Sequence, residues 1–300
     1  MTKFKSWITA FRLRTLPLAI SSILMGSFLA IASGIYNWFV ISLSIITTLF
    51  LQILSNLAND YGDGIKGTDN KDRVGPVRTI QSGKISPKEM RIGIVIFIIL
   101  SLISGIWLIV ESLGSSWYLG LLFFLLGLAA IASAIKYTVG NNAYGYIGFG
   151  DLFVFLFFGL LAVAGTYFLN THSLDWKIFL PASAIGLLST GVLNLNNMRD
   201  MKNDSKSGKR TLALTLGYSF SKTYHTILIA SAMILLVVFI ALQYNNPWQF
   251  IFVISFPTMI KELIEINKIT DKKLLDPYLK KLAFSTLILT LLFGMGIIFG

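Results

Sequence analysis

The sequence predicts an all-α integral membrane protein with nine membrane-spanning helices, its N-terminus inside and its C-terminus outside. Of its 300 residues, 55% are hydrophobic and only 13% are charged, whereas a soluble domain carries about 25% charged residues. The apolar residues form long unbroken runs, and about 20 apolar residues suffice to cross a bilayer as a helix. The Lys and Arg residues fall almost entirely between alternate pairs of these runs.

Nine apolar runs are long enough to be membrane spans. They lack the short alternating pattern of a membrane barrel, so each is expected to be a helix. The eighth is the weakest, because Pro257 interrupts it and Lys261 and Glu262 close it early. The expected spans are residues 16–35, 38–58, 92–112, 117–135, 151–170, 178–197, 224–242, 248–264 and 281–299.

The distribution of basic residues fixes the expected orientation. With the N-terminus inside, all 25 Lys and Arg residues except Lys177 fall in inside segments, as the positive-inside rule requires. The net charge of +11 therefore indicates cytoplasmic loops and not a nucleic-acid-binding surface. The chain has no cysteine, which excludes disulfides and thiolate chemistry.

Two long inside loops, at about 59–91 and 197–223, each follow a helix end rich in Asn and Asp. Asp60 and Asp200 in these segments are 140 positions apart. This spacing suggests an internal repeat of the kind seen in other polytopic membrane proteins. The expected arrangement is a single domain, 1–300, with pseudo-repeated half-bundles at about 16–135 and 151–264 and a ninth helix at about 281–299.

The first polar cluster comprises Asn56, Asn59, Asp60 and Asp63, spaced so that all four share one face of a helix. Acidic residues at the end of a membrane helix are costly unless they are paired or bind a metal. Mg²⁺ takes one or two carboxylates and completes its shell with water and phosphate oxygens. We predict Asn59, Asp60 and Asp63 as metal ligands, both aspartates as catalytic residues, and Asn56 as a substrate contact; solvated loop carboxylates are the alternative.

The second polar cluster has the same chemistry at the corresponding place in the second half. Asp200 and Asp204 are one helical turn apart, with Asn196 and Asn197 a turn earlier on the same side. Two facing carboxylate clusters can hold divalent ions, and those ions can hold a diphosphate leaving group. We therefore predict Asp200 and Asp204 as catalytic metal ligands and Asn197 as a substrate contact.

Basic residues follow both clusters and fit the same task, because cations stabilise the charge on a departing diphosphate. Most loop cations only determine topology. Arg78 and Lys209 are the strongest candidates, since each sits in a Gly-containing segment. The candidate phosphate- and acceptor-binding cations are Lys66, Arg73, Arg78, Lys136, Lys209 and Arg210.

Tyr137 lies where a membrane helix meets the inside surface. It is either an interfacial belt residue or an aromatic face that stabilises an allylic carbocation through its quadrupole. The Phe-rich run 153–158 is either simple packing or the lining for a long polyprenyl tail. His172 and His225 show no metal-ligand spacing and receive no role.

Several motifs, taken in order, resemble the UbiA-type intramembrane prenyltransferases, and more narrowly the branch that prenylates 1,4-dihydroxy-2-naphthoate in menaquinone biosynthesis. The resemblance covers most of the chain, from Arg14-Thr15-Leu16-Pro17 to Asp276-Pro277. The motifs that carry it are Asn56 to Asp69, Asp72-Arg73-Val74-Gly75-Pro76-Val77-Arg78 with Gln81-Ser82-Gly83, Tyr137-Thr138 through Gly148-Phe149-Gly150-Asp151, and Asn197-Met198-Arg199-Asp200 through Gly208-Lys209-Arg210-Thr211-Leu212.

The resemblance implies nine helices around a central cavity, Mg²⁺ held by the two Asp-rich motifs, and a lateral opening to lipid for the polyprenyl tail. It implies polyprenyl transfer from the diphosphate to the naphthoate, with loss of carbon dioxide, in the bacterial plasma (inner) membrane with the site facing the cytoplasm. One position departs from the wider superfamily, which often has another Asp four residues after Asp63. Gly67 stands there, so the role of Asp69 stays open.

Two alternatives remain on sequence grounds. The acceptor could be another aromatic compound, such as the 4-hydroxybenzoate of the ubiquinone pathway. A secondary transporter would also show repeats and intramembrane polar residues, but the polar clusters here sit at cytoplasmic helix ends and not at mid-membrane.

Overall fold

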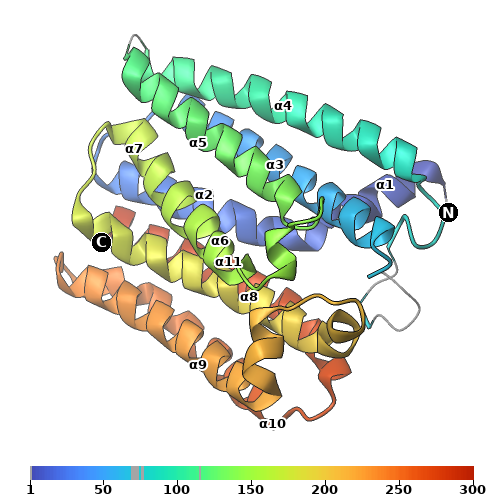
Figure 1. Cartoon of the computed structure of the whole chain (residues 1–300). Coiled ribbons are helices and arrows are strands. Elements are labelled where there is room, and N and C mark those ends of the chain that lie inside the picture. The colour runs from blue at the N-terminus through green and yellow to red at the C-terminus, as the bar shows by residue number, and fades with distance from the viewer. Residues whose placement is uncertain (1, 69–73, 76–77, 115) are drawn as a thin grey trace.

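The protein is a bundle of long helices that lie side by side (Figure 1). The computed structural model describes residues 2–68, 74–75, 78–114 and 116–300, and within these ranges every regular element is helical. The elements are α1 (Lys3–Phe11), η1 (Leu13–Thr15), α2 (Leu16–Ala32), α3 (Trp38–Ile65), α4 (Pro87–Leu113), α5 (Trp117–Lys136), η2 (Tyr144–Tyr146), α6 (Gly150–Val154), η3 (Phe155–Ala164), α7 (Gly165–Thr171), η4 (Trp176–Ile178), α8 (Phe179–Lys206), α9 (Leu212–Ala241), η5 (Pro247–Ser255), α10 (Phe256–Lys268), η6 (Lys272–Leu275) and α11 (Asp276–Phe299).

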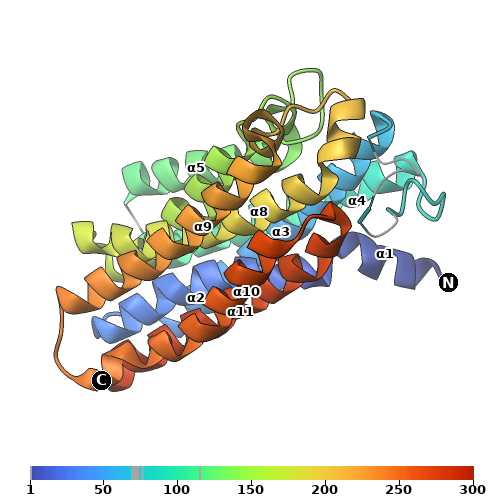
Figure 2. The ribbon, with the colours of Figure 1, turned by 90° about the horizontal axis from the view of Figure 1, so that it is seen from below.

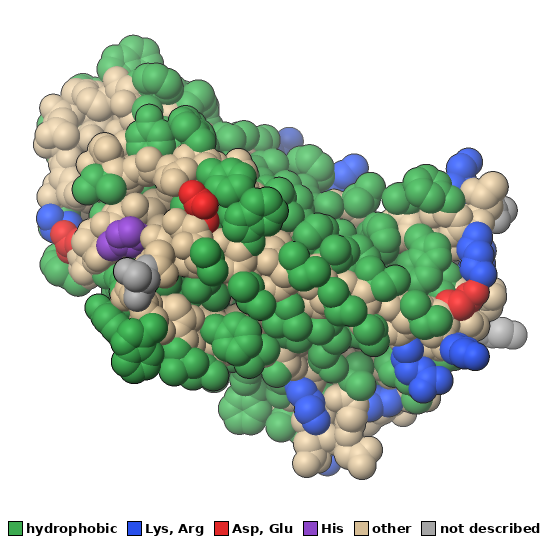
Figure 3. Space-filling model, turned by 90° about the horizontal axis from the view of Figure 1, so that it is seen from above, with side chains coloured by type: hydrophobic (Ala, Val, Ile, Leu, Met, Phe, Trp, Pro, Cys, Tyr) green, Lys and Arg blue, Asp and Glu red, His purple; other side chains and the backbone are tan. Residues whose placement is uncertain are grey.

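Eight helical segments of the described chain are long and apolar enough to cross a membrane. Their outer faces expose apolar side chains; α4, for example, exposes Ile92, Ile96, Ile99, Ile103 and Val110. Figure 3 shows hydrophobic side chains across the middle of one face, with most of its Lys and Arg side chains towards one end. The prediction of an all-α, multi-pass membrane protein is confirmed.

The predicted eighth span is interrupted. Residues 247–268 form the nine-residue 3₁₀ helix η5 followed by the 13-residue α10, with Pro257 in the first turn of α10. This segment is absent from the eight, since its two pieces are short and its second half carries charged residues. It nevertheless packs along α11.

The helices that contain the second and sixth spans run past the predicted span ends at 58 and 197. Helix α3 continues to Ile65 and α8 to Lys206, so both Asp clusters lie on helices, as their spacing predicts, and the inside loops begin later than predicted. Hydropathy falls where these polar residues begin, but backbone hydrogen bonding continues through them because their side chains find partners inside the bundle.

Helices α4 and α9 begin before the predicted starts of the third and seventh spans, because capping residues extend their first turns. Helix α4 begins at Pro87, where Ser86 and Glu89 form a capping box. Helix α9 begins at Leu212, where the Thr211 side chain accepts a hydrogen bond from the Leu214 backbone. Caps of this kind satisfy the free N–H groups of a first turn.

Helix α11 closes the bundle by packing against α2, α8 and η5. The two chain termini lie at opposite ends of the bundle (Figures 1 and 2). The C-terminal ends of α3 and α8 point towards the end that carries α1 (Figure 1).

One very close helix contact is between η3, a π-helical stretch, and α8. A Cβ atom placed on Gly159 would lie 2.6 Å from Cα of Gly186 and 2.7 Å from the backbone oxygen of Ala182. Only a residue without a side chain fits between two backbones that approach so closely.

We expect Gly159→Ala to lower the thermal midpoint of the detergent-solubilised protein, because overpacking at a rigid contact costs about 1–3 kcal/mol. The matched control is Gly120→Ala in α5, where an added Cβ would meet Ile109 at an ordinary 3.6 Å. Equal midpoints for the two variants, measured by a fluorescence melt, would contradict this account of the contact.

Candidate functional site

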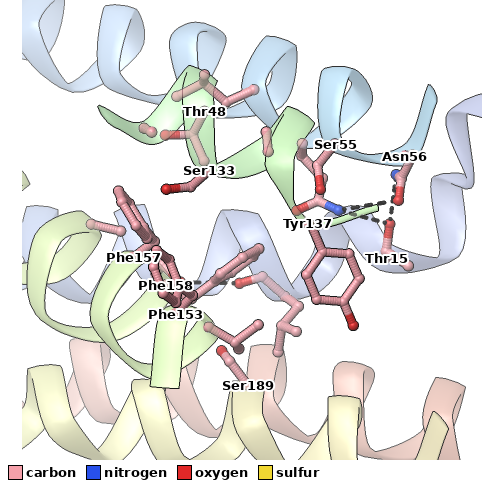
Figure 4. Close-up of a pocket in the computed structure, with 18 of the residues that line it drawn as sticks. Thr15, Thr48, Ser55, Asn56, Ser133, Tyr137, Phe153, Phe157, Phe158 and Ser189 are labelled. Atoms are coloured by element: carbon pink, nitrogen blue, oxygen red, sulfur yellow. Dashed lines mark hydrogen bonds between the residues drawn. The ribbon is translucent and has the colours of Figure 1, made fainter. Parts of the chain in front are cut away.

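A cavity of about 400 Å³ opens between the helices. Polar and charged side chains line one part of it, and apolar side chains line the rest. Figure 4 shows Tyr137, Asn56 and Thr15 on one side and Phe153, Phe157 and Phe158 on the other. The lining of this one cavity therefore combines charged and polar side chains with aromatic rings.

Three of the four predicted aspartates line this cavity. Asp63 comes from α3, whereas Asp200 and Asp204 come from α8. The amide side chains of Asn59 and Asn196 line the same cavity. The structure thus brings together side chains that are more than a hundred positions apart in the sequence.

Asp60 is placed differently from the other three. It is 1% exposed and is not part of the cavity lining. Its carboxylate forms ion pairs with Arg12 and with Arg78, the latter at 3.2 Å, and accepts a hydrogen bond from the Thr79 hydroxyl at 3.1 Å. Both arginines line the cavity, so Asp60 fixes two guanidinium groups in its wall.

Asp63 is tied to the segment after α5. Its Oδ1 accepts a hydrogen bond of 2.8 Å from the Tyr146 hydroxyl, which also lies 2.6 Å from Oγ1 of Thr68. Nearby, the Thr138 hydroxyl donates to the backbone oxygen of Ala58 at 3.0 Å. These contacts hold the end of α3 against the chain that carries Tyr137.

Lys209 faces the same group of side chains. Its ammonium lies 5.4 Å from the ring centroid of Tyr146 and 5.8 Å from that of Tyr137. Burial acts to lower the pKa of Lys209, but the negative charges of Asp63 and Asp204 outweigh it, and the pKa is raised. Burial raises the pKa of Tyr137 to about 12, against the opposing charge of Lys209. At neutral pH the site therefore presents an ammonium and a neutral phenol.

Asp200 is held by its neighbour Arg199. The Nε and Nη2 atoms of Arg199 donate to the two carboxylate oxygens of Asp200 at 2.8 and 2.6 Å. Arg199 also donates from Nη2 to Asn196 at 2.8 Å and from Nη1 to Asp276 of α11. The second Asp cluster is thereby connected to the last helix.

A row of aromatic rings forms part of the cavity lining. The Tyr137 and Tyr144 rings meet edge to face at 5.4 Å, and Tyr144 stacks on Phe153 at 4.0 Å. Phe153 in turn stacks on Phe157 at 6.1 Å. All four rings line the cavity.

Several predicted site residues lie outside the cavity lining. Asn197 is buried behind it, and Lys66 is exposed with its ammonium 3.9 Å from the Tyr146 ring centroid. Lys136 and Arg210 are exposed, and the Arg210 backbone N–H donates to the Tyr146 oxygen at 3.0 Å. The structure does not test their predicted roles. Arg73 and Asp69 lie outside the described residues.

The lining residues that were not predicted as site residues include Arg12, Arg14, Asn196 and Lys280. Both arginines lie just before the first span, where basic residues are usually taken as topological signals. Lys280 fell within the inside loop expected between the eighth and ninth spans, although it lies in α11. Asn196 and Asn197 are adjacent, and only the exact helix register decides which one faces the cavity.

The donor set suits a hard divalent cation. No preformed group of three or more His, Asp or Glu side chains able to hold a metal occurs among the described residues. Mg²⁺ does not require one, because it takes one or two carboxylates and obtains its other ligands from water and phosphate. Asn203 of α8 has a buried Oδ1 without a hydrogen-bond partner in the described structure, but it is not part of the cavity lining.

Comparison with known proteins shows the family of the chain. A model of the UbiA prenyltransferase family matches residues 19–284 of the chain. The 1,4-dihydroxy-2-naphthoate octaprenyltransferase of Haemophilus influenzae is 42% identical over 304 residues, which cover 99% of this chain and 97% of the relative. The Escherichia coli protein of the same name is 39% identical over 298 residues, covering 99% and 96%.

The fold is also shared with a solved structure. A UbiA homologue from Archaeoglobus fulgidus, bound to GPP and Mg²⁺, aligns with a TM-score of 0.58 over 97% of this chain and 100% of that one, at 16% identity. At this identity the likeness concerns the fold alone. The family match spans most of the chain and the relatives match almost all of it, so the chain belongs to the UbiA prenyltransferase family.

Proposed function

We propose that the protein transfers a polyprenyl group from polyprenyl diphosphate to 1,4-dihydroxy-2-naphthoate, with loss of carbon dioxide and diphosphate, giving demethylmenaquinol. One observation carries the proposal: carboxylates, cations and a row of aromatic rings all line the same cavity. The relatives that match nearly the whole chain are named for this acceptor.

In this proposal, the cations in the cavity lining bind the diphosphate. Arg12 and Arg78 present guanidinium groups in the cavity wall, and Lys209 adds a buried ammonium. Guanidinium groups bind phosphate oxygens through paired hydrogen bonds, whereas an ammonium acts as a point charge. Asp60 contributes by holding the two arginines in place.

The carboxylates bind Mg²⁺. Asp63, Asp200 and Asp204 supply oxygens that face the cavity, with Asn59 beside them. Asp60 keeps lone pairs beyond those that its arginine partners use and belongs to the same proposed set. The ion, when bound, offsets the diphosphate charge and makes it a better leaving group. The homologue from Archaeoglobus fulgidus was solved with GPP and Mg²⁺.

In this proposal the aromatic rings stabilise the carbocation. Breaking the allylic C–O bond leaves this cation, and the rings of Tyr137, Tyr144 and Phe153, which line the cavity, would stabilise it through their π-electrons. The apolar interior keeps water from quenching this cation. The naphthoate ring then forms the new C–C bond, and its carboxylate leaves as carbon dioxide.

We further propose nine membrane crossings with the N-terminus and the site on the cytoplasmic side of the bacterial inner membrane. Termini at opposite ends of the bundle require an odd number of crossings, and η5 with α10 supplies the ninth. The Lys and Arg distribution supports this orientation. The chain is then one domain, built from two half-bundles and a closing helix.

We expect Asp63→Asn and Asp204→Asn each to lower prenyl transfer in membranes at least about 100-fold, because the site loses a charged oxygen donor. The control is Asp175→Asn, at an exposed helix start that Asn caps equally well. Product would be measured by chromatography, with and without EDTA. Full activity in metal-free membranes would refute the magnesium proposal.

Acceptor choice is tested by incubating the membranes with polyprenyl diphosphate and Mg²⁺, offering dihydroxynaphthoate and 4-hydroxybenzoate in parallel. We expect product only from the naphthoate, with one carbon dioxide released per transfer. Prenylated 4-hydroxybenzoate as the main product would assign the chain to the other acceptor. Substrate uptake into vesicles without any product would instead support a transporter.

The absence of cysteine from the sequence makes the topology directly testable. We expect a single cysteine at the exposed position Ser173 to react with a membrane-impermeant maleimide in spheroplasts, and one at the exposed position Ser205 to react only after permeabilisation. The reverse pattern would invert the orientation, and labelling of both in intact cells would overturn the crossing count.

A further inference from the structure

Tyr146 contacts the charged part of the cavity wall without lining the cavity itself. It is the last residue of η2, on the segment between α5 and α6. Its hydroxyl donates to Oδ1 of Asp63 at 2.8 Å, and within the described residues this is the one side-chain hydrogen bond that Asp63 accepts. Asp63 does line the cavity and is 7% exposed. The Tyr146 hydroxyl therefore lies directly behind a carboxylate that faces the ligand space.

The direction of the hydrogen bonds at Tyr146 follows from their chemistry. An ionised carboxylate can only accept, so Tyr146 gives its single hydroxyl proton to Asp63. A phenol keeps that proton at neutral pH. The Thr68 hydroxyl lies 2.6 Å from the Tyr146 oxygen and must therefore be the donor in that contact. The two bonds form a chain from Thr68 through Tyr146 to Asp63, and this chain fixes the orientation of the phenol O–H.

The backbone around this chain is anchored to α8 and to the segment that follows it. The Thr68 carbonyl oxygen accepts a hydrogen bond from the buried Asn203 side chain of α8 at 2.7 Å. The Tyr146 carbonyl oxygen accepts one from the Arg210 N–H at 3.0 Å. Asn203 immediately precedes Asp204. Tyr146 is thus held in place relative to the helix that carries the second Asp cluster.

Two lysines lie against the same ring. The ammonium groups of Lys66 and Lys209 are 3.9 and 5.4 Å from the ring centroid of Tyr146, within the range of cation–π attraction. Both ammonium groups also attract the charge of Asp63. Replacing Tyr146 with Phe removes the hydroxyl but leaves the ring and every one of these charges. The substitution therefore separates the hydrogen bond from the electrostatics of the site.

We propose that Tyr146 is a positioning residue whose hydroxyl holds the Asp63 carboxylate in the orientation that binds a divalent cation, and thereby sets the affinity of the site for that cation. This inference rests on the proposed function, since it concerns the same cation. The terminal torsion of an aspartate is soft, so without the donor the carboxylate would turn towards Lys66 or Lys209. Removing the hydrogen-bond partner of a metal-binding carboxylate typically lowers metal affinity by about 10–100-fold.

The test is direct metal binding by the purified full-length protein in detergent. Mn²⁺ would be titrated with inorganic pyrophosphate present, and free Mn²⁺ measured by its electron paramagnetic resonance signal against a protein-free blank with the same pyrophosphate. We expect Tyr146→Phe to weaken Mn²⁺ binding about tenfold or more. In the activity assay, the same variant should raise the Mg²⁺ concentration for half-maximal rate, while the rate at saturating Mg²⁺ changes far less.

The matched control is Tyr218→Phe in α9. The Tyr218 hydroxyl donates to the Ile269 carbonyl oxygen at 3.1 Å. Lys222 and Lys272 lie 4.6 and 5.1 Å from its ring centroid. The same chemical change is thus made in similar surroundings, but at a residue that contacts neither Asp cluster in the described structure. We expect the Mn²⁺ affinity of this variant to equal that of the parent chain.

Thr68→Val provides a second variant. It removes the hydroxyl that donates to the Tyr146 oxygen and leaves a side chain of similar shape. We expect it to weaken Mn²⁺ binding by a smaller factor than Tyr146→Phe, because Asp63 keeps its own donor. Should Tyr146→Phe not fold, this variant decides the question, and an unchanged Mn²⁺ affinity in it would then overturn the inference.

A structural role alone would lower the melting temperature of the metal-free Tyr146→Phe protein without moving the Mn²⁺ affinity of its folded fraction, and that result would overturn the inference. An equal loss of affinity in Tyr218→Phe would overturn it as well. A parent chain that binds no Mn²⁺ would contradict both this inference and the magnesium proposal. A parent chain that binds Mn²⁺ but transfers no prenyl group would contradict the proposed function and leave the binding comparison to decide the role of Tyr146.

Discussion

Buried pairs of arginine and aspartate organise the charged end of this molecule. Arg12 and Arg78 meet Asp60, and Arg199 meets Asp200 and Asp276. The Arg12–Asp60 contact connects the segment before α2 with the end of α3, and the Arg199–Asp276 contact connects the end of α8 with the start of α11, whereas Arg199 and Asp200 are neighbours on α8. Asp60 and Arg199 are buried, and leaving either without its partners would cost about 3–5 kcal/mol. The position of the cavity wall therefore depends on these few contacts.

The two Asp clusters look alike in sequence but have different surroundings. The first places one carboxylate between two guanidinium groups and turns the other towards Tyr146. The second keeps both carboxylates at the cavity, with a single guanidinium shared between two acids. A diphosphate with its counter-ion needs cations on one side and anions on the other. A repeated motif can supply both once its neighbours differ.

The sequence was sufficient for the fold class and for eight long apolar helices, because apolar runs are local signals. It could not show that Asp60 is enclosed by arginines, since Arg12 and Arg78 approach it only in three dimensions. Nor could it separate Asn196 from Asn197, which differ only in helix register. The helix ends at Ile65 and Lys206 were missed because hydropathy measures the cost of leaving water, whereas these polar turns are satisfied inside the protein. Lys280 was missed because the sequence assigned it to a basic loop, whereas it lies in α11 and lines the cavity.

The π-helical stretch η3 has a consequence for how this chain can vary. Its ten residues, Phe155–Ala164, follow α6 directly and continue into α7. Such wide turns are rare and are found mostly at functional sites; here the stretch brings the adjacent Phe157 and Phe158 to one wall. Losing one residue would let the stretch tighten to an ordinary helix and rotate everything after it by about 100°. Substitutions in this wall would change its shape locally, but a gap of a single position would turn α7 away from its neighbours.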